Sequence, residues 1–307
     1  MTRRLHLAVL GALALVGGTA ATPAPGGIPA EPPVVTRIIS SGADPVIEIR
    51  AGGGDVEVMP GGNDNVVLVS NPEAAVTSQR GGRGQAFYLT TERPVEGHIV
   101  RIGRVVVLPP MRRDQTLVRI AVNAGDIRLR IPARTAVLVV NDTSGAVTIK
   151  GFRGRAIVRS FGALTVRSSR LSGESYLQVG GACDLADVDG DDLSVGVFGG
   201  PARARHVRAR TLEVASRGAF VDWELTANRG DTQSFAIEAG ELLLRVPAAA
   251  HARIVANSTA GSLGGILQVS AAPFGMDISA SGTFGGGGAN VAITAEDSSV
   301  NVVRGKS

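Results

Sequence analysis

The stretch Gly125-Asp-Ile-Arg-Leu-Arg-Ile-Pro132 returns later in the chain as Gly240-Glu-Leu-Leu-Leu-Arg-Val-Pro247, and an earlier stretch, Gly54-Asp-Val-Glu-Val-Met-Pro60, has the same pattern. Each copy combines a glycine, a short segment in which apolar and polar residues alternate, and a proline. Alternation with a period of two is typical of a β-strand with one buried face. Proline is tolerated at the end of a strand. The pattern therefore predicts one strand per copy.

The second and third copies continue in parallel through residues 133–141 and 248–257 to turns of small residues. Shorter strand-like segments recur between them at intervals of roughly 17 to 29 residues, which is close to the spacing of stacked repeat proteins. Each segment has too few apolar residues for a core of its own, so neighbouring units must share one. Glycine, with 41 copies, suits the tight corners between strands and disfavours helices. We therefore expect a nearly all-β chain that forms a β-solenoid-like stack.

The N-terminus has the three parts of a secretory signal: Arg3 and Arg4, an apolar run over residues 5–16, and small residues over 17–21. The run is shorter than the roughly 18 apolar residues that a membrane anchor needs. We expect cleavage near residue 21, an exported protein that is periplasmic, secreted or part of the cell envelope, and no membrane span in the mature chain. Residues 22–36 are rich in proline, glycine and alanine and are expected to be a linker. We expect residues 37–122 to form an N-terminal β region or sandwich-like cap and residues 123–305 to form the repeat domain.

Composition narrows the choice of partners. Lysine and arginine number 31 and aspartate and glutamate 27, so the net charge is only +4, and aromatic residues make up 4%. Nucleic-acid binding proteins interleave clustered basic residues with aromatic ones, so we expect no nucleic-acid partner. The single cysteine, Cys183, excludes an intramolecular disulfide, and we expect it to be a buried small apolar side chain.

Three late segments carry a family resemblance: residues 240–248, residues 254–263 and the glycine-rich end over 284–302. They resemble the bacterial "putative adhesin" family, a domain of unknown function, over about residues 142–303 and more loosely back to Arg37. The resemblance implies a right-handed parallel β-helix-like stack in an envelope or exported protein, and its name suggests an adhesive role. Asp297-Ser-Ser-Val300 departs from the family pattern, which has a glycine before the last strand.

An acidic segment and an arginine row are the candidate sites. Asp187, Asp189 and Asp191 alternate along the chain and provide the oxygen ligands that Ca²⁺ prefers; the alternative is a solvated turn whose carboxylates cap backbone N–H groups. In an extended strand, guanidinium groups from every second residue would share one face and could bind an anionic glycan or a lipid headgroup. The alternatives are an exposed strand that discourages edge pairing, or arginines neutralised by the neighbouring aspartates. The row consists of Arg203, Arg205, Arg208 and Arg210.

No motif for a catalytic nucleophile, a metal site or a phosphate-binding loop occurs in the sequence. Outside the expected signal, the histidines His98, His206 and His251 have no acidic partner at a recognisable spacing. We therefore expect a protein without enzymatic activity or a cofactor, other than the calcium ion considered above. Its expected role is an adhesin-like binding or structural module whose partner is a cell-surface glycan or another envelope component. The alternative is a carbohydrate-active enzyme that acts on acidic polysaccharide.

Overall fold

A computed structural model describes residues 33–42, 44–62, 64–70, 73–82, 85–95, 98–108, 110–271 and 277–305. The expected signal, residues 1–21, and residues 22–32 of the expected linker lie outside these ranges. Within them every helix or strand assigned is a strand, so the prediction of an all-β chain is confirmed, and no helix there could cross a membrane. The strands are Val35–Ser40 (β1), Val46–Ala51 (β2), Val56–Gly61 (β3), Asn65–Ser70 (β4), Ala75–Gly82 (β5), Gln85–Val95 (β6), His98–Leu108 (β7), Met111–Val122 (β8), Ile127–Pro132 (β9), Val137–Thr143 (β10), Val147–Lys150 (β11), Arg153–Ser160 (β12), Leu164–Val179 (β13), Cys183–Phe198 (β14), Ala202–Arg217 (β15), Phe220–Glu224 (β16), Thr232–Glu238 (β17), Glu241–Val246 (β18), Ala252–Thr259 (β19), Ser262–Gly265 (β20), Gln268–Ala271 (β21), Asp277–Phe284 (β22), Ala289–Glu296 (β23) and Ser299–Arg304 (β24).

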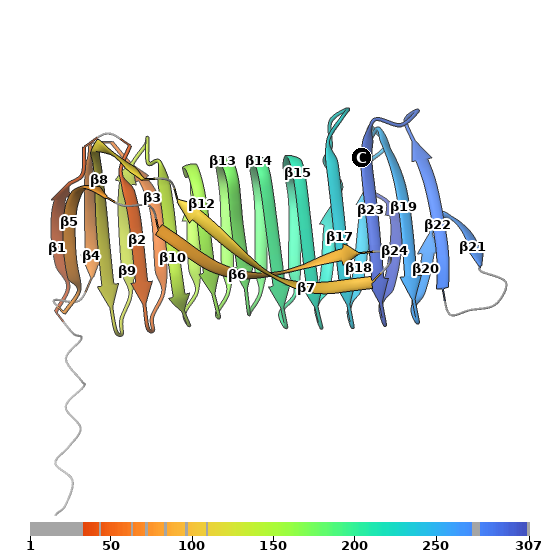
Figure 1. Cartoon of the computed structure of the whole chain (residues 1–307), viewed down its shortest axis with the longest axis horizontal. Helices are drawn as coiled ribbons and strands as arrows, with labels where there is room; N and C mark the ends of the chain where they lie inside the picture. Colours follow the sequence, from red (N-terminus) through yellow and green to blue (C-terminus); the bar gives the residue numbers. More distant parts are fainter. Residues whose placement is uncertain are drawn as a thin grey trace, which may run out of the picture. The chain divides into compact units, whose positions relative to one another are not determined.

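One long sheet contains 22 of these strands, and most of its neighbouring strands are parallel. Figure 1 shows them standing side by side. Val147 lies opposite Leu164, Leu164 opposite Cys183, and Cys183 opposite Ala202, so each turn of the chain is in register with the next. The regular spacing of strand-like segments in the sequence therefore equals the number of residues in one turn of the chain, after which a strand pairs with the strand of the previous turn.

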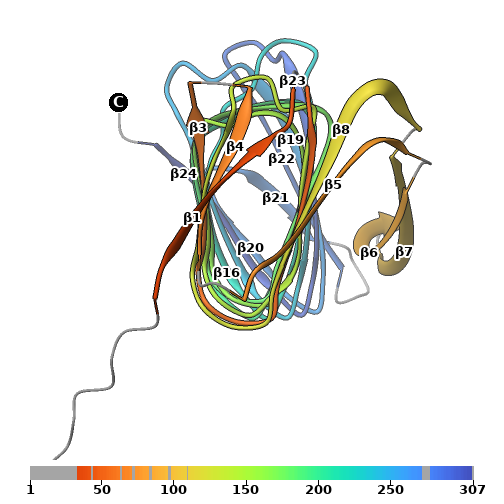
Figure 2. The same ribbon diagram turned by 90° about the vertical axis from the view of Figure 1, so that its left-hand side faces the viewer.

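The strands lie on two sides of one apolar core, and β13, β14 and β15 each run from one side to the other (Figure 2). We call the side with β10, β12 and β17 side A and the side with β9, β11 and β18 side B. A rung is a side A strand together with the side B strand that follows it. The chain passes from side A to side B through a tight corner and returns through a wider bend. Val56 lies opposite both Ile127 and Val147, and all three are buried, so neighbouring rungs stack apolar side chains in one column.

The tight corner is lined by a column of glycines: Gly125, Gly54, Gly145, Gly162, Gly181 and Gly200 follow one another from rung to rung. A Cβ atom on Gly145 would lie 1.9 Å from the carbonyl oxygen of Gly54, and one on Gly162 would lie 2.3 Å from that of Gly145. Neither residue has a left-handed backbone. Glycine marks this corner as expected, but at these positions it is required because the backbones approach too closely for any side chain.

The order of the rungs departs from the order of the sequence near both ends of the sheet. The rung β2–β3 lies between β8–β9 and β10–β11. The rung β23–β24 likewise lies between β17–β18 and β19–β20. Each end thus contains one rung that is held on both sides by rungs distant in the sequence.

The N-terminal region does not form the separate sandwich-like cap expected over residues 37–122. Strands β2, β3 and β8 belong to the 22-stranded sheet, because their alternating apolar residues match those of the later rungs in register. Strands β1, β4 and β5 pair antiparallel at this end. Strands β4 and β5 pair with the edge of the β8–β9 rung, so the parallel stack ends here.

A separate antiparallel hairpin, β6–β7, crosses the outside of side A (Figure 1). The buried side chains of Val106 and Leu108 at the end of β7 pack against Val139, Ile157 and Tyr176 of three neighbouring rungs. Farther along the sheet, the backbone N–H of Ile99 donates a hydrogen bond to Glu296 Oε1 over 2.6 Å. The hairpin is therefore attached to side A at both of these points.

The substitution Gly145→Ala tests the glycine column. We expect it to destabilise the protein by about 3 kcal/mol or more, because the backbone of two rungs must separate to admit the methyl group. Urea unfolding followed by far-ultraviolet circular dichroism measures the loss. Gly62→Ala is the matched control, since a Cβ there meets nothing within 4 Å. Equal stability of the two variants would contradict the close stacking.

Candidate functional site

The three aspartates expected to bind calcium do not share a site. Asp187 Oδ1 lies 3.0 Å from His206 Nδ1, whereas Asp191 Oδ2 accepts a hydrogen bond from the backbone N–H of Gly173 over 2.8 Å. Asp189 is exposed between them. No group of three acidic, histidine or cysteine side chains in the described part of the chain is placed to hold a metal ion. Asp191 instead caps a backbone N–H, as the alternative interpretation had it.

The arginine row is divided by the backbone. His206 has a left-handed conformation, with a φ of 52°, so Arg203 and Arg205 precede the bend of β15 and Arg208 and Arg210 follow it. The four arginines stay on the outer side of β15, because Ala204, Val207 and Ala209 face the core, but the bend places them on two segments instead of one flat row. Arg210 Nη2 lies 3.2 Å from Asp192 Oδ2, so part of the row is neutralised by the rung before it.

Arg205 belongs to a charged cluster centred on Asp222, whose side chain is only 9% exposed. Arg205 Nη2 donates to Asp222 Oδ2 over 2.7 Å, and Arg245 Nε donates to Asp222 Oδ1 over 2.7 Å. Burial alone would raise the pKa of Asp222, but the hydrogen bonds from Arg245 and Arg205 outweigh burial and hold that pKa below its ordinary value. The cluster joins three rungs and is structural, because its carboxylate is already fully used by two guanidinium groups.

His206 lies between two acids that the sequence did not reveal as partners. Its Nε2 lies 3.7 Å from Glu224 Oε1, on the opposite side from Asp187. Both partners sit one rung away, Asp187 on the turn before the histidine and Glu224 on the turn after it. The distance in sequence between neighbouring rungs, 19 residues from Asp187 to His206, was the signal that could have identified these partners. The expectation that His206 has no acidic partner is wrong. His251 Nδ1 lies within hydrogen-bond distance of the carbonyl oxygen of Gly285, and the side chain of His98 is outside the described part of the structure.

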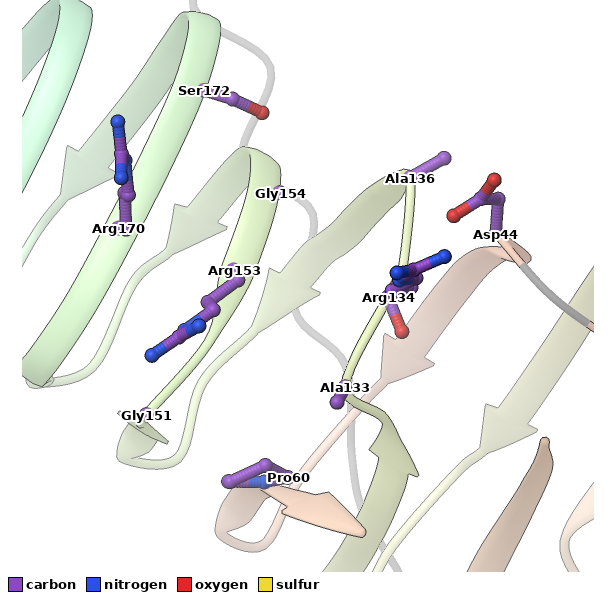
Figure 3. Close-up of a pocket in the computed structure, with 11 residues that line it drawn as sticks. Asp44, Pro60, Ala133, Arg134, Ala136, Gly151, Arg153, Gly154, Arg170 and Ser172 are labelled. Carbon is purple, nitrogen blue, oxygen red and sulfur yellow. The ribbon is translucent and has the colours of Figure 1, made fainter. Parts of the chain in front are cut away.

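A different set of arginines surrounds a pocket with a volume of about 650 Å³. The pocket lies at the wider bend, next to the points where the chain enters the stack before β2 and leaves it after β3. Figure 3 shows the wall of the pocket. The segment that leads from β9 to β10 passes this gap. The lining residues are Asp44, Pro60, Ala133, Arg134, Thr135, Ala136, Gly151, Arg153, Gly154, Arg170 and Ser172.

The wall of the pocket is built from small residues. A Cβ on Gly154 would lie 2.1 Å from the carbonyl oxygen of Thr135, so only glycine fits where these two segments touch. Ala133 and Ala136 add one methyl group each (Figure 3). Because no long side chain fills the gap in the stack, the space stays open.

The rim of the pocket is cationic. Arg134, Arg153 and Arg170 come from three neighbouring turns of the chain (Figure 3), and Arg153 lies directly opposite Arg170 in the sheet. All three are exposed, and none forms an ion pair with a described residue. The one acidic side chain at the rim, Asp44, lies 3.2 Å from Arg112 Nη2. Unpaired guanidinium groups bind carboxylates and phosphates, so this pocket is the candidate functional site.

Cys183 points into the core and takes no part in this site. Its side chain is buried, and burial, with a smaller contribution from the charge of Asp184, raises the pKa of its thiol to about 12. The expectation of a buried small side chain agrees with this placement.

Comparisons with known proteins add little to this picture. No family model matches the chain, and no curated protein sequence does. Among solved structures, a putative cell adhesion protein from Clostridium sporogenes ATCC 15579 matches with a TM-score of 0.27 and 10% sequence identity, over 90% of this chain and 100% of that chain. The resemblance to the adhesin family stays a prediction.

The substitution Asp222→Asn tests the charged cluster. It leaves Arg205 and Arg245 without their anion, and we expect a loss of about 2 kcal/mol in the free energy of unfolding at pH 7. Because the pKa of Asp222 is lowered in the folded state, its contribution is complete above the ordinary aspartate pKa of about 3.9 and is lost as the pH falls through the lowered value. Urea unfolding at pH 7, 5 and 3 should show the same gap between wild type and variant at pH 7 and 5 and a narrower gap at pH 3. Asp189→Asn, at an exposed carboxylate without an ion pair to a described residue, should change stability far less.

The thiol of Cys183 should not react with Ellman's reagent at pH 8 in the folded protein, because it is both buried and protonated. After unfolding in guanidinium chloride, one thiol per chain should react. Rapid reaction without denaturant would show that the core around Cys183 opens readily.

Proposed function

We propose that this chain is an exported binding module of the cell envelope that holds anionic polymers, such as acidic cell-surface polysaccharides, through the pocket rimmed by Arg134, Arg153 and Arg170. The observation that carries the proposal is the absence of an acidic partner, among the described residues, for these three guanidinium groups. The signal-like pattern of residues 1–21 supports export.

The scaffold that we propose is a right-handed parallel β-helix, the fold that the family resemblance implies. The parallel register of Leu164, Cys183 and Ala202 supports it, since each turn brings the chain back to the same side. Such a scaffold is rigid along its stack and offers fixed positions for side chains on its surface.

The spacing of the arginines favours a polymer over a small ion. Neighbouring strands lie about 4.8 Å apart, so arginines on successive turns form a row instead of a single point. A chain with repeated carboxylates can occupy several of them at once, and each forked guanidinium group can bind a carboxylate through two hydrogen bonds.

The chemistry of the rim favours binding over catalysis. Arginine stays protonated at every physiological pH, so it can hold an anion but cannot exchange a proton with it. Asp44, the one acid at the rim, lies beside Arg112. We therefore propose stoichiometric binding without turnover.

Binding of polygalacturonate, with dextran as the uncharged control, tests the proposal. We expect the double variant Arg153→Ala/Arg170→Ala to bind polygalacturonate at least about tenfold more weakly, a loss of about 1.4 kcal/mol, and wild-type binding to weaken as salt is added. Arg229→Ala/Arg253→Ala removes the same charge from two exposed arginines that do not line the pocket and should bind like wild type. Equal losses in the two double variants would refute a specific site. Release of reducing ends or unsaturated sugars would show an enzyme instead.

A further inference from the structure

A second cavity, of about 310 Å³, lies next to the arginine pocket, and the two share Ala136 and Ser172 as lining residues. It opens between the bend, the start of β2 and the base of the β6–β7 hairpin. Its lining residues are Val46, Leu108, Pro110, Met111, Gln115, Ala136, Val137, Arg155, Ser172 and Gly173.

The two long polar side chains of this cavity, Gln115 and Arg155, are already engaged, and Ser172 is exposed. Gln115 Nε2 donates to the carbonyl oxygen of Asp44 over 3.2 Å, and its Oε1 accepts from the backbone N–H of Arg112 over 3.0 Å. Arg155 Nε donates to the carbonyl oxygen of Glu174 over 2.7 Å. The side chains of Val46, Leu108, Met111 and Val137 remain, so the space offers an apolar surface to a ligand.

We propose that the two cavities form one site for a single-chain anionic amphiphile, with its carboxylate or phosphate at Arg153 and Arg170 and its alkyl chain between Val46, Leu108 and Met111. This inference rests on the proposed anion-binding role of the arginine pocket and specifies its ligand. A polysaccharide that carries acyl groups would present the same two chemistries.

Size and charge both support this ligand. A volume of 310 Å³ is near the lower limit of ligand pockets, which hold about 300 to 1,000 Å³, and it suits one narrow chain better than a fused ring system or a paired lipid. The apolar lining gains from each methylene group that leaves water. The arginines then favour a negatively charged headgroup at the open end of the cavity, where the alkyl chain of the ligand ends.

Titration calorimetry of the purified chain with octanoate, decanoate and dodecanoate below their micelle concentrations tests the inference. Each pair of added methylenes should tighten binding about 15-fold while the cavity fills, which corresponds to about 0.8 kcal/mol per methylene. Decyl phosphate should bind in the same way, because arginine forks fit either anion. Decyltrimethylammonium should bind at least tenfold more weakly than decanoate, and equal binding of the two would overturn the role of the arginines.

Two variants separate the two ends of the site. Ser172→Trp places a large ring at the shared wall from an exposed position, so it should abolish the dependence on chain length without unfolding the protein. Ser270→Trp, an exposed serine of β21 that lines neither cavity, is the matched control. Arg153→Ala/Arg170→Ala should weaken all chain lengths by the same factor. Retention of the full chain-length effect in Ser172→Trp would refute the proposed position of the alkyl chain.

Failure of this inference is distinguishable from failure of the proposed function. If polygalacturonate binds in an arginine-dependent way and the affinity for fatty acids does not depend on chain length, the amphiphile proposal is refuted and the anionic-polymer proposal is supported. If fatty acids bind with an affinity that depends on both chain length and the arginines, and polygalacturonate does not bind, the amphiphile proposal is supported and the anionic-polymer proposal is refuted.

Discussion

The close stacking of backbone on backbone at the glycine column sets the geometry of the whole sheet. At Gly54, Gly145 and Gly162 the next rung lies where a side chain would begin, so each rung must turn at the same place as its neighbour. Parallel pairing and apolar columns follow from that common turning point, since residues at equivalent positions of successive turns then face the same way. The same constraint places surface side chains in rows, which is how Arg153 comes to lie opposite Arg170.

Stability of a stacked repeat protein is usually a sum over neighbouring units, and its terminal units are the weakest. Near both ends of this stack, however, one rung lies between rungs that are distant in the sequence. Strand β23 lies between β17 and β19, so pairs that are distant in the sequence, such as Thr232 and Asn290, hold the end together. The chain must fold back before this rung can form, and loop closure makes that step slow. Once formed, the inserted rung β23–β24 hydrogen-bonds to both β17–β18 and β19–β20 and so opposes local unfolding of the end of the sheet.

The sequence was sufficient for the parts of the fold that repeat. Alternation in residues 56–60 and 127–131 predicted two strands with the same pattern, and the structure pairs them directly, Val56 opposite Ile127. It was insufficient at the wider bend. The left-handed residue there is Ser168, Asp187 and His206 on three successive turns, and no shared residue type marks the position. The arginine pocket combines residues 44, 60, 134, 153 and 170, which only the insertion of β2–β3 into the stack brings together, and no local pattern encodes that insertion.

Net charge was a poor guide to the candidate site because several opposite charges cancel between neighbouring rungs. On side B, Glu57 lies 3.0 Å from Lys150, Asp184 lies 2.7 Å from Arg167, and Asp222 is shared by two arginines, each pair bridging neighbouring rungs. At the bend, Arg134, Arg153 and Arg170 form no ion pair with a described residue, although Asp189 lies opposite Arg170 on the next turn. The rim of the pocket therefore carries several unpaired positive charges although the chain as a whole has a net charge of only +4.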